Sequence, residues 1–273
     1  MAPDETARLL ASLTELHLPA FRRCYEELAR QAQQEGLSYE RFLLHLAERD
    51  CQERRDKRIE RLLRQAHLPL EKSWSALELQ RFPAKVLHQA RTLLAGAFVD
   101  HRENVLVFGQ PGSGKTHLLA VIGQELVRSG RKVQFWTTGL LVQELLIAKR
   151  DLKLARALKR LARYEVLILD DLGYVHQSRE EMEVLFTLLA ERYERGSVLL
   201  TSNLPFSGWE AIFKDPMTTA AAIDRLVHHA VIIELNLPSY RMEQAKKAKG
   251  RGAGSPDTPP PPRRSGILIV VRQ

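Results

Sequence analysis

The 273-residue sequence has only two cysteines, Cys24 and Cys51, and no CxxC spacing. It therefore offers neither a disulfide framework nor a cysteine-based zinc site. Its longest apolar runs, such as Val166 to Leu169, are far shorter than the roughly 20 residues that a membrane-spanning helix needs. Asp4 and Glu5 precede any apolar stretch, so the basic leader and apolar segment of a secretory signal are lacking. These absences predict a cytoplasmic protein that does not associate with a membrane.

The composition is that of a globular protein with a basic bias. Apolar residues make up 44% and charged residues 27%, enough to bury a substantial core. The formal net charge of +8 indicates a polyanionic partner, although bulk charge alone argues only for nonspecific attraction. Part of the charge is concentrated between residues 149 and 163, where one acid, Asp151, accompanies seven basic residues: Lys149, Arg150, Lys153, Arg156, Lys159, Arg160 and Arg163.

The first 79 residues read as a small helical module, which we expect to interact with a partner or DNA. Leucine and aromatic residues recur at near-helical spacing from 6 to 34, and Pro19 divides this stretch into two short helices. Ser38 can cap a further helix that ends before Pro69. Residues 70–100 look like a connector with one helix around 84–97, and we place a domain boundary near residue 80.

From residue 104 the pattern changes to short β-branched runs separated by helices, which is typical of a parallel sheet covered on both faces. A helix between two of the strands starts at a capping box of Ser178 and Glu181, ends near Arg195, and has Gly196 at the position of a left-handed residue. Residues 80–245 therefore form the predicted α/β domain, and the Pro-rich, basic tail 246–273 is predicted to be disordered. The predicted strands are 105–108, 133–136, 166–169, 198–201 and 231–235.

One octapeptide carries the strongest functional signal. It matches the GxxxxGK[ST] phosphate-binding loop, and it follows a predicted strand and precedes a helix, as that motif requires. Backbone N–H groups and the helix N-terminus would bind phosphates, Lys115 would reach the β- and γ-phosphates of ATP, and Thr116 would ligate Mg²⁺. An ordinary glycine-rich turn is the alternative. The predicted ATP-binding residues are Gly109, Gln110, Pro111, Gly112, Ser113, Gly114, Lys115, Thr116 and His117.

Two more strands end in polar residues at the same edge of the predicted sheet. Asp170 and Asp171 follow the run 166–169, where the P-loop fold expects an acid that holds Mg²⁺. We assign the metal to Asp170 and the orientation or deprotonation of the attacking water to Asp171. Asn203 follows the run 198–201 and is placed to contact the γ-phosphate or the water. The alternatives are a buried strand that runs into an acidic turn, and a turn-forming asparagine before Pro205.

Together with Asn203, the segments Ala220 to His229 and Ser239 to Arg241 give the chain a family resemblance. It resembles the AAA+ ATPases and, within them, the IstB-like ATP-binding proteins of insertion sequences, over roughly residues 10–245. The DnaC and DnaI helicase loaders share the double aspartate. The resemblance implies an ATPase that assembles on DNA and supports a separate, cognate transposase. A helicase loader that acts in DNA replication is the alternative function.

By this resemblance Arg225 would be an arginine finger that reaches the ATP site of a neighbouring subunit, which requires a homo-oligomer with shared sites. Arg241 would be a second sensor. A surface ion pair of Arg225 with Asp224 or Glu234 is the alternative. The chain departs from many AAA+ proteins in having Asp171 where a glutamate is common, and in leaving room for only a minimal lid. A small-molecule kinase is disfavoured, since Asn203 and Arg225 fit an oligomeric switch better.

The basic stretch 149–163 is predicted to lie along one side of a single helix, because its charges recur at spacings of 3 and 4. Such a helix could follow the phosphate backbone of duplex DNA largely without regard to base sequence. A solvated helix face is the alternative. No helix-turn-helix signature predicts base recognition.

Overall fold

The computed structural model describes residues 2–173, 178–213, 215–240 and 242–244. Arg241 and the predicted tail lie outside these ranges. No helix within them is both long and apolar enough to cross a membrane. The elements in chain order are α1 (Pro3–Glu15), α2 (Pro19–Glu35), α3 (Tyr39–Ala66), the 3-10 turn η1 (Leu79–Arg81), α4 (Ala84–Leu94), α5 (Ala97–Asp100), β1 (Asn104–Gly109), α6 (Lys115–Arg128), β2 (Val133–Thr137), α7 (Thr138–Arg150), α8 (Leu154–Leu161), β3 (Val166–Leu172), α9 (Arg179–Arg192), β4 (Ser197–Ser202), η2 (Phe206–Gly208), α10 (Glu210–Phe213), α11 (Pro216–Val227) and β5 (Ala230–Leu235).

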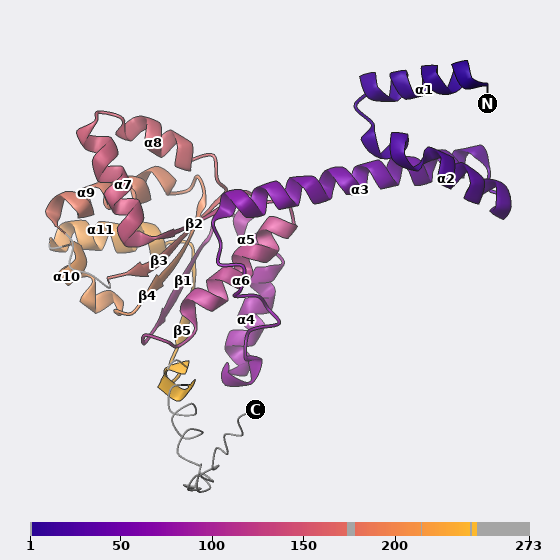
Figure 1. Cartoon of the computed structure of the whole chain (residues 1–273). Coiled ribbons are helices and arrows are strands. Elements are labelled where there is room, and N and C mark those ends of the chain that lie inside the picture. Colours follow the sequence, from indigo (N-terminus) through magenta and orange to yellow (C-terminus); the bar gives the residue numbers. More distant parts are fainter. Residues whose placement is uncertain (1, 174–177, 214, 241, 245–273) are drawn as a thin grey trace, which may run out of the picture.

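The predicted α/β fold is confirmed. Five strands pair in parallel in the order β2-β3-β4-β1-β5, and helices cover both faces of the sheet (Figure 1). Alternation along the strands divides the core in two. Val105 and Val107 pack with α4 and α6 on one face, and Leu106 and Phe108 pack with α7, α9 and α11 on the other. The P-loop therefore follows a central strand that is buried on both faces.

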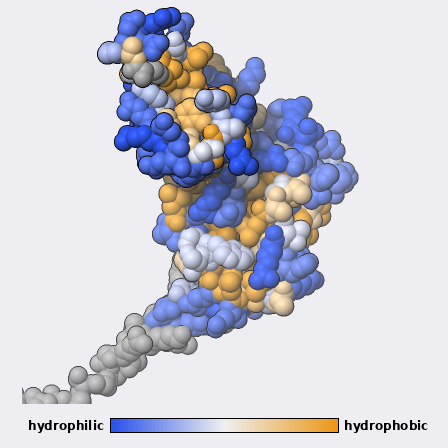
Figure 2. Space-filling model, turned by 90° about the vertical axis from the view of Figure 1, so that its right-hand side faces the viewer, coloured by the Kyte–Doolittle hydropathy of each residue, from blue (hydrophilic) through white to orange (hydrophobic). Residues whose placement is uncertain are grey.

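The N-terminal helices form an arm. Figure 1 shows α3 extending from the α/β body, with α1 and α2 beside its outer end. Ser38 caps α3 through the N–H of Arg41, as predicted, and buried Asp50 accepts the N–H of Ala20 from α2 at 3.2 Å. The arm also exposes hydrophobic surface, which Figure 2 shows in the upper part of the molecule, and Leu16 and Leu43 contribute to it.

The inner end of α3 belongs to the core of the body. Leu62 and Ala66 are buried in the same cluster as Val105, and so are Leu68, just after α3, and Leu77 of the connector. The connector is thus held against the sheet rather than extended between two units. The predicted boundary near residue 80 stays a prediction, since packing alone does not identify an independently folding unit.

The end of α9 differs from the prediction. The helix ends at Arg192, and the left-handed residue after it is Glu194, with φ 56°, not Gly196. The buried guanidinium of Arg192 donates to the carbonyl groups of Tyr164, Glu165 and Ser197. A Cβ on Gly196 would lie 2.5 Å from Arg192 Nη2. Glycine is therefore needed here for the close approach of a buried arginine. Burial lowers the pKa of this arginine to about 10.

Candidate ATP site

The P-loop connects the end of β1 to the start of α6. Two of its glycines have the left-handed φ values that a side chain rarely adopts, 80° at Gly112 and 100° at Gly114. Space is also short, because a Cβ on Gly112 would lie 2.2 Å from the hydroxyl oxygen of Ser239. The glycines therefore allow a tight loop to pass directly under the segment that follows β5. Tyr240 in that segment donates its backbone N–H to the Gly112 carbonyl at 3.0 Å.

Lys115 is the first residue of α6, and its side chain folds back across the loop. Its ammonium group donates to the carbonyl oxygens of Gly109 at 2.8 Å and Gln110 at 3.1 Å. The hydroxyl oxygen of Ser113 is buried and has no hydrogen-bond partner in the described part of the chain. An ammonium and an unsatisfied hydroxyl beside a helix N-terminus are groups that suit phosphate oxygens.

Thr116 and Asp170 bring a hydroxyl and a carboxylate together at the ends of α6 and β3. Oδ1 of Asp170 accepts from Oγ1 of Thr116 at 3.0 Å and from Oγ1 of Thr201 at 2.6 Å. Burial raises the pKa of the Asp170 carboxyl above its usual value, and the hydrogen bond from Thr201 opposes that rise. Because Mg²⁺ takes oxygen ligands, this donor set fits the predicted metal site.

Asp171 has the opposite environment to its neighbour. The register of β3 against β4 shifts between Leu169 and Leu172, and Asp171 has a left-handed φ of 61°. Its backbone N–H donates to Oγ1 of Thr201 at 2.8 Å, while its side chain is exposed beside a cavity. The irregularity thus turns one aspartate into the interior and presents the next one to the cavity.

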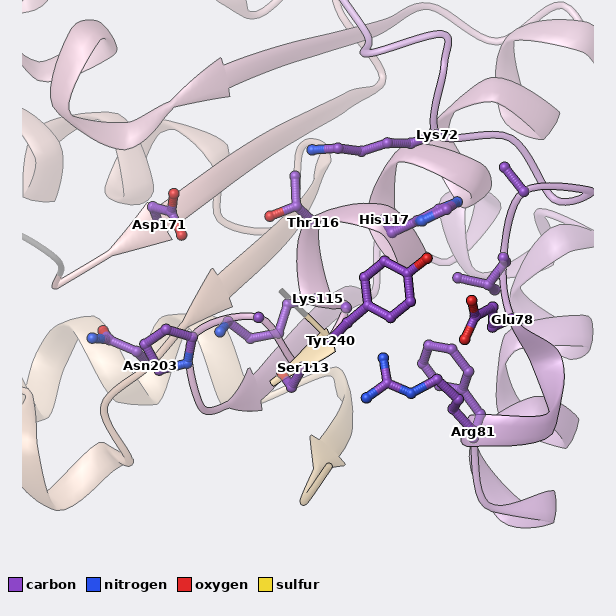
Figure 3. Close-up of a pocket in the computed structure, with 16 residues that line it drawn as sticks. Lys72, Glu78, Arg81, Ser113, Lys115, Thr116, His117, Asp171, Asn203 and Tyr240 are labelled. Carbon is purple, nitrogen blue, oxygen red and sulfur yellow. The ribbon is translucent and has the colours of Figure 1, made fainter. Parts of the chain in front are cut away.

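The cavity joins the predicted residues to a segment that the sequence did not indicate. Its volume is about 540 Å³. Asp171 and Asn203 lie on one side of it and the connector lies on the other, with Tyr240 between them (Figure 3). Oδ1 of Asn203 is buried without a hydrogen-bond partner in the described ranges, which leaves it available to a ligand. The connector residues that line the cavity are Lys72, Ala76, Leu77, Glu78, Arg81 and Phe82.

Contacts on both sides hold the connector at the cavity. Arg81 donates to the Pro238 carbonyl at 2.8 Å, and its guanidinium lies over the Tyr240 ring, 5.0 Å from the centroid. His117, one of the predicted ATP-binding residues, is within hydrogen-bond distance of the Ser73 carbonyl, at 2.9 Å. No motif marks these connector residues in the sequence, so only the fold could reveal them.

Arg225 does not line this cavity. It lies near the C-terminal end of α11, beside the start of β1, whereas the P-loop follows the end of β1. Its guanidinium donates to the Ala221 carbonyl at 2.8 Å and lies 4.8 Å from the centroid of the Phe186 ring. It makes no ion pair with the described residues Asp224 and Glu234. It borders a second cavity of about 240 Å³ together with His101, Arg102, Asn104, Tyr193, Glu194 and His229.

The basic stretch is not one helix, which corrects the sequence prediction. Helix α7 ends at Arg150 and α8 begins at Leu154, so the charges belong to two helices joined by a turn. Lys149, Lys153 and Arg160 pair with Glu183, Asp151 and Glu144. The remaining basic side chains of the stretch are exposed and make no ion pair in the described part of the chain: Arg150, Arg156, Lys159 and Arg163.

The predicted site residues thus fall into three groups. Those of the P-loop, the two aspartates and Asn203 are brought together, Arg225 and the basic stretch lie elsewhere, and Arg241 is outside the described residues. Their individual roles stay predictions. The site therefore has the parts of a nucleotide pocket, and Arg225 is not among the described residues that line it.

Solved structures share the fold, and two of them are the DnaC helicase loader and DnaI. The DnaC helicase loader superposes with a TM-score of 0.51 at 18% identity, covering 60% of this chain and 98% of that one. DnaI gives a TM-score of 0.51 at 24% identity, covering 62% and 95% of the two chains. At these identities the likeness concerns the fold alone.

Sequence comparison gives the family. A putative insertion sequence ATP-binding protein of Sinorhizobium fredii (strain NBRC 101917 / NGR234) is 41% identical over 270 residues, covering 98% of this chain and 90% of the relative. The IS21 putative ATP-binding protein of Pseudomonas aeruginosa is 37% identical, covering 82% of this chain and 84% of the relative. The sequence model of the IstB-like ATP binding proteins matches residues 11–248. This chain therefore belongs to the family of IstB-like ATP binding proteins.

Proposed function

We propose that this chain is an ATP-hydrolysing helper of transposition, which assembles on duplex DNA and supports the transposase of its insertion sequence. The ATPase part of this proposal is carried by Lys115, Thr116 and Asp171 at one cavity, with Asp170 hydrogen-bonded to Thr116. The relatives described as insertion sequence ATP-binding proteins support the transposition part. Hydrolysis would then control when the DNA-bound assembly is stable.

In the proposed reaction Lys115 leaves the loop carbonyls and binds the β- and γ-phosphates. Thr116 and Asp170 would hold Mg²⁺, which supplies positive charge to the phosphates. Asp171 faces the cavity, where it orients or deprotonates the attacking water, and the Asn203 amide contacts the γ-phosphate or that water. The backbone N–H groups of the P-loop stabilise the charge that develops on the phosphoryl oxygens.

A first test is Lys115→Ala. The loss of the ammonium should lower ATP hydrolysis by at least about 100-fold, because one preorganised charge at the phosphates is removed. Lys85→Ala, an exposed lysine on α4, is the matched control and should hydrolyse ATP normally. Normal hydrolysis by folded Lys115→Ala protein, with folding checked by circular dichroism, would contradict the ATPase proposal.

We propose further that Arg225 acts on the ATP of a neighbouring subunit. Its position beside the second cavity, away from its own P-loop, supports a role in trans. Arg225→Ala should bind ATP but hydrolyse it poorly, as should Asp171→Asn. Mixing the two variants should restore part of the activity, since one mixed interface then combines an intact finger with an intact carboxylate. Absence of rescue in mixtures that co-assemble would contradict a trans finger.

The proposed DNA surface is the basic stretch on α7 and α8. Replacing Arg156, Lys159 and Arg160 by Ala should weaken duplex binding and make the log-log salt slope shallower by about 0.9 for each phosphate that is no longer neutralised. The control replaces Lys85 and Arg91, two exposed basic residues on α4 at the other face of the sheet. Equal weakening in both variants would indicate bulk charge rather than a defined surface.

The fold likeness to DnaC and DnaI favours a second candidate, a helicase loader. The transposition helper and the helicase loader differ in the reaction that the ATP-bound protein stimulates. We expect the ATP-bound protein to stimulate strand transfer by the cognate transposase. We do not expect it to stimulate the loading of a replicative helicase onto single-stranded DNA. The reverse result would favour the loader.

A further inference from the structure

The turn between α7 and α8 is held in a rigid form. After the last residue of α7, the N–H of Leu152 donates to the Lys149 carbonyl at 3.1 Å, and the N–H of Lys153 donates to the Ala148 carbonyl at 2.7 Å. This pair of bonds is the Schellman motif, whose left-handed residue is usually glycine. Leu152 occupies that position, with φ 57°. A leucine therefore stands where backbone geometry favours glycine.

Packing does not explain this leucine. The residue is 94% exposed, more than any other large hydrophobic residue in the described ranges. The other non-glycine residues with positive φ in those ranges are His17, His67, Arg102, Asp171 and Glu194, so Leu152 is the aliphatic one. The left-handed backbone opposes folding for a leucine, and no contact of its exposed side chain offsets that strain. A leucine at this position therefore costs stability, which points to a function outside the folded monomer.

Basic residues surround the exposed leucine. Arg150 precedes the turn and Arg156 lies in the first turn of α8, and both are exposed without an ion pair in the described part of the chain. Asp151 in the turn is paired with Lys153 at 3.2 Å. We call the turn between α7 and α8, residues 151–153, the tip. It combines one exposed apolar side chain with cations on both sides. A duplex offers matching chemistry, since phosphates flank its grooves and apolar side chains can enter between its base pairs.

We propose that Leu152 is a wedge that enters between two stacked base pairs of bound duplex DNA and kinks it, while Arg150 and Arg156 contact the flanking phosphates. The inference rests on the proposed DNA binding and adds a mode of DNA deformation to it. The tip requires no base sequence, because the wedge contacts the faces of the bases and not their edges. A single leucine beside Asp151 buries too little apolar surface to serve as a membrane anchor.

The experiment uses the full chain with ATP and Mg²⁺ on a duplex that carries 2-aminopurine and a dye pair at its ends. Wild-type protein should raise the 2-aminopurine fluorescence by unstacking and shorten the end-to-end distance. Leu152→Ala and Leu152→Gly should lose most of both signals and bind at most about tenfold more weakly, and Leu152→Met should retain them. Leu140→Ala, which removes another exposed leucine of α7, is the control and should behave as wild type.

The salt dependence separates the wedge from the phosphate contacts. Leu152→Ala removes no cation, so its log-log salt slope should equal that of wild type, whereas Arg150→Ala with Arg156→Ala should give a shallower slope. The wedge would be overturned if Leu152→Ala distorted the DNA as much as wild type does. It would also be overturned if wild-type protein bound the duplex without distorting it. If Leu152→Ala lost transposase stimulation but distorted DNA normally, the wedge would be overturned and a protein contact indicated. Failure of wild-type protein to bind duplex would instead contradict the proposed function.

Discussion

Asp171 and Leu152 share a left-handed backbone but differ in everything around it. Asp171 lies at an irregularity of the sheet, its N–H is held by Thr201, and its side chain faces a cavity with Asn203. Leu152 lies at a turn between two surface helices and is held only by backbone hydrogen bonds. The polar neighbours of Asp171 indicate what its strained backbone serves. Leu152 has no packing contact that would explain its strain, so its role has to be inferred from its exposure.

The polar environment of Asp170 explains why the region around Asp170 and Asp171 holds its geometry. Thr116 and Thr201 donate to its carboxylate, and Thr138 donates to its backbone carbonyl at 2.8 Å. Since Thr201 also receives the N–H of Asp171, one hydroxyl connects the two acids. The edge of the sheet around Asp170 and Asp171 is therefore organised before ligand binds. The turn at Leu152 has no such network, and its shape depends on local backbone hydrogen bonds alone.

The largest expected effect tests whether the strain at Asp171 serves chemistry. Asp171→Asn should bind ATP with Mg²⁺ but hydrolyse it about 100-fold more slowly or worse, because the carboxylate that acts on water is removed. Asparagine tolerates the left-handed region, so the backbone should be kept. Nucleotide binding measured by calorimetry and hydrolysis measured by phosphate release decide the matter. A variant unable to bind ATP with Mg²⁺ would show that Asp171, not Asp170, holds the metal.

The next prediction removes the hydroxyl that connects the two acids. Thr201→Val is nearly isosteric but leaves the N–H of Asp171 without its acceptor, so the free energy of unfolding should fall by about 1–3 kcal/mol. Hydrolysis should fall as well, because Asp171 loses its fixed orientation. Thr201→Ser is the matched control and should retain both properties. Urea unfolding checks the stability, and an unchanged Thr201→Val protein would mean that the network has no role in holding the acids.

A smaller effect concerns the buried acid without ligand. Because burial raises the pKa of Asp170 in the folded state, the folded protein takes up a proton more readily than the unfolded chain. The charged carboxylate therefore costs stability at pH values above its folded pKa, and this cost is relieved as the pH falls through that value. Asp170→Asn should be at least as stable as wild type at neutral pH in the absence of Mg²⁺, and its unfolding free energy should vary less with pH. A less stable apo variant at neutral pH would contradict this sign.

The smallest expected effect is at the tip. Leu152→Gly relieves a left-handed strain of about 1–2 kcal/mol and costs about 0.5–1 kcal/mol in the entropy of the unfolded chain. The unfolding free energy should therefore rise by up to about 1.5 kcal/mol, although the proposed function of the tip is abolished. Asp171→Gly should stabilise less, because aspartate tolerates this conformation better than leucine. Destabilisation by Leu152→Gly in urea would mean that the leucine has a packing role.

The basic stretch shows where sequence reasoning was insufficient. Spacings of 3 and 4 continue through residues 149–163, but the chain turns at Leu152, where no glycine or proline marks the break. Gly196 was misread for the opposite reason. Its glycine suggested a left-handed helix end, whereas its absent side chain makes room for Arg192. At Leu152 the fold imposes a turn that the local sequence does not mark, and at Gly196 it imposes a close approach of Arg192. In both cases the tertiary structure overrides the local sequence rule.

The sequence by itself determined the P-loop, the strands and the acids that follow them, because each depends on a few adjacent residues: Gly109 to Thr116, then Asp170 and Asp171. Parallel strands bring their carboxyl ends to one edge, so those groups could be placed together before the structure was known. Only the tertiary structure decided that the connector, with Arg81 and Phe82, forms the other wall of the cavity. These residues precede the P-loop by about 30 positions and reach it through packing, and no local pattern encodes a contact between segments so far apart.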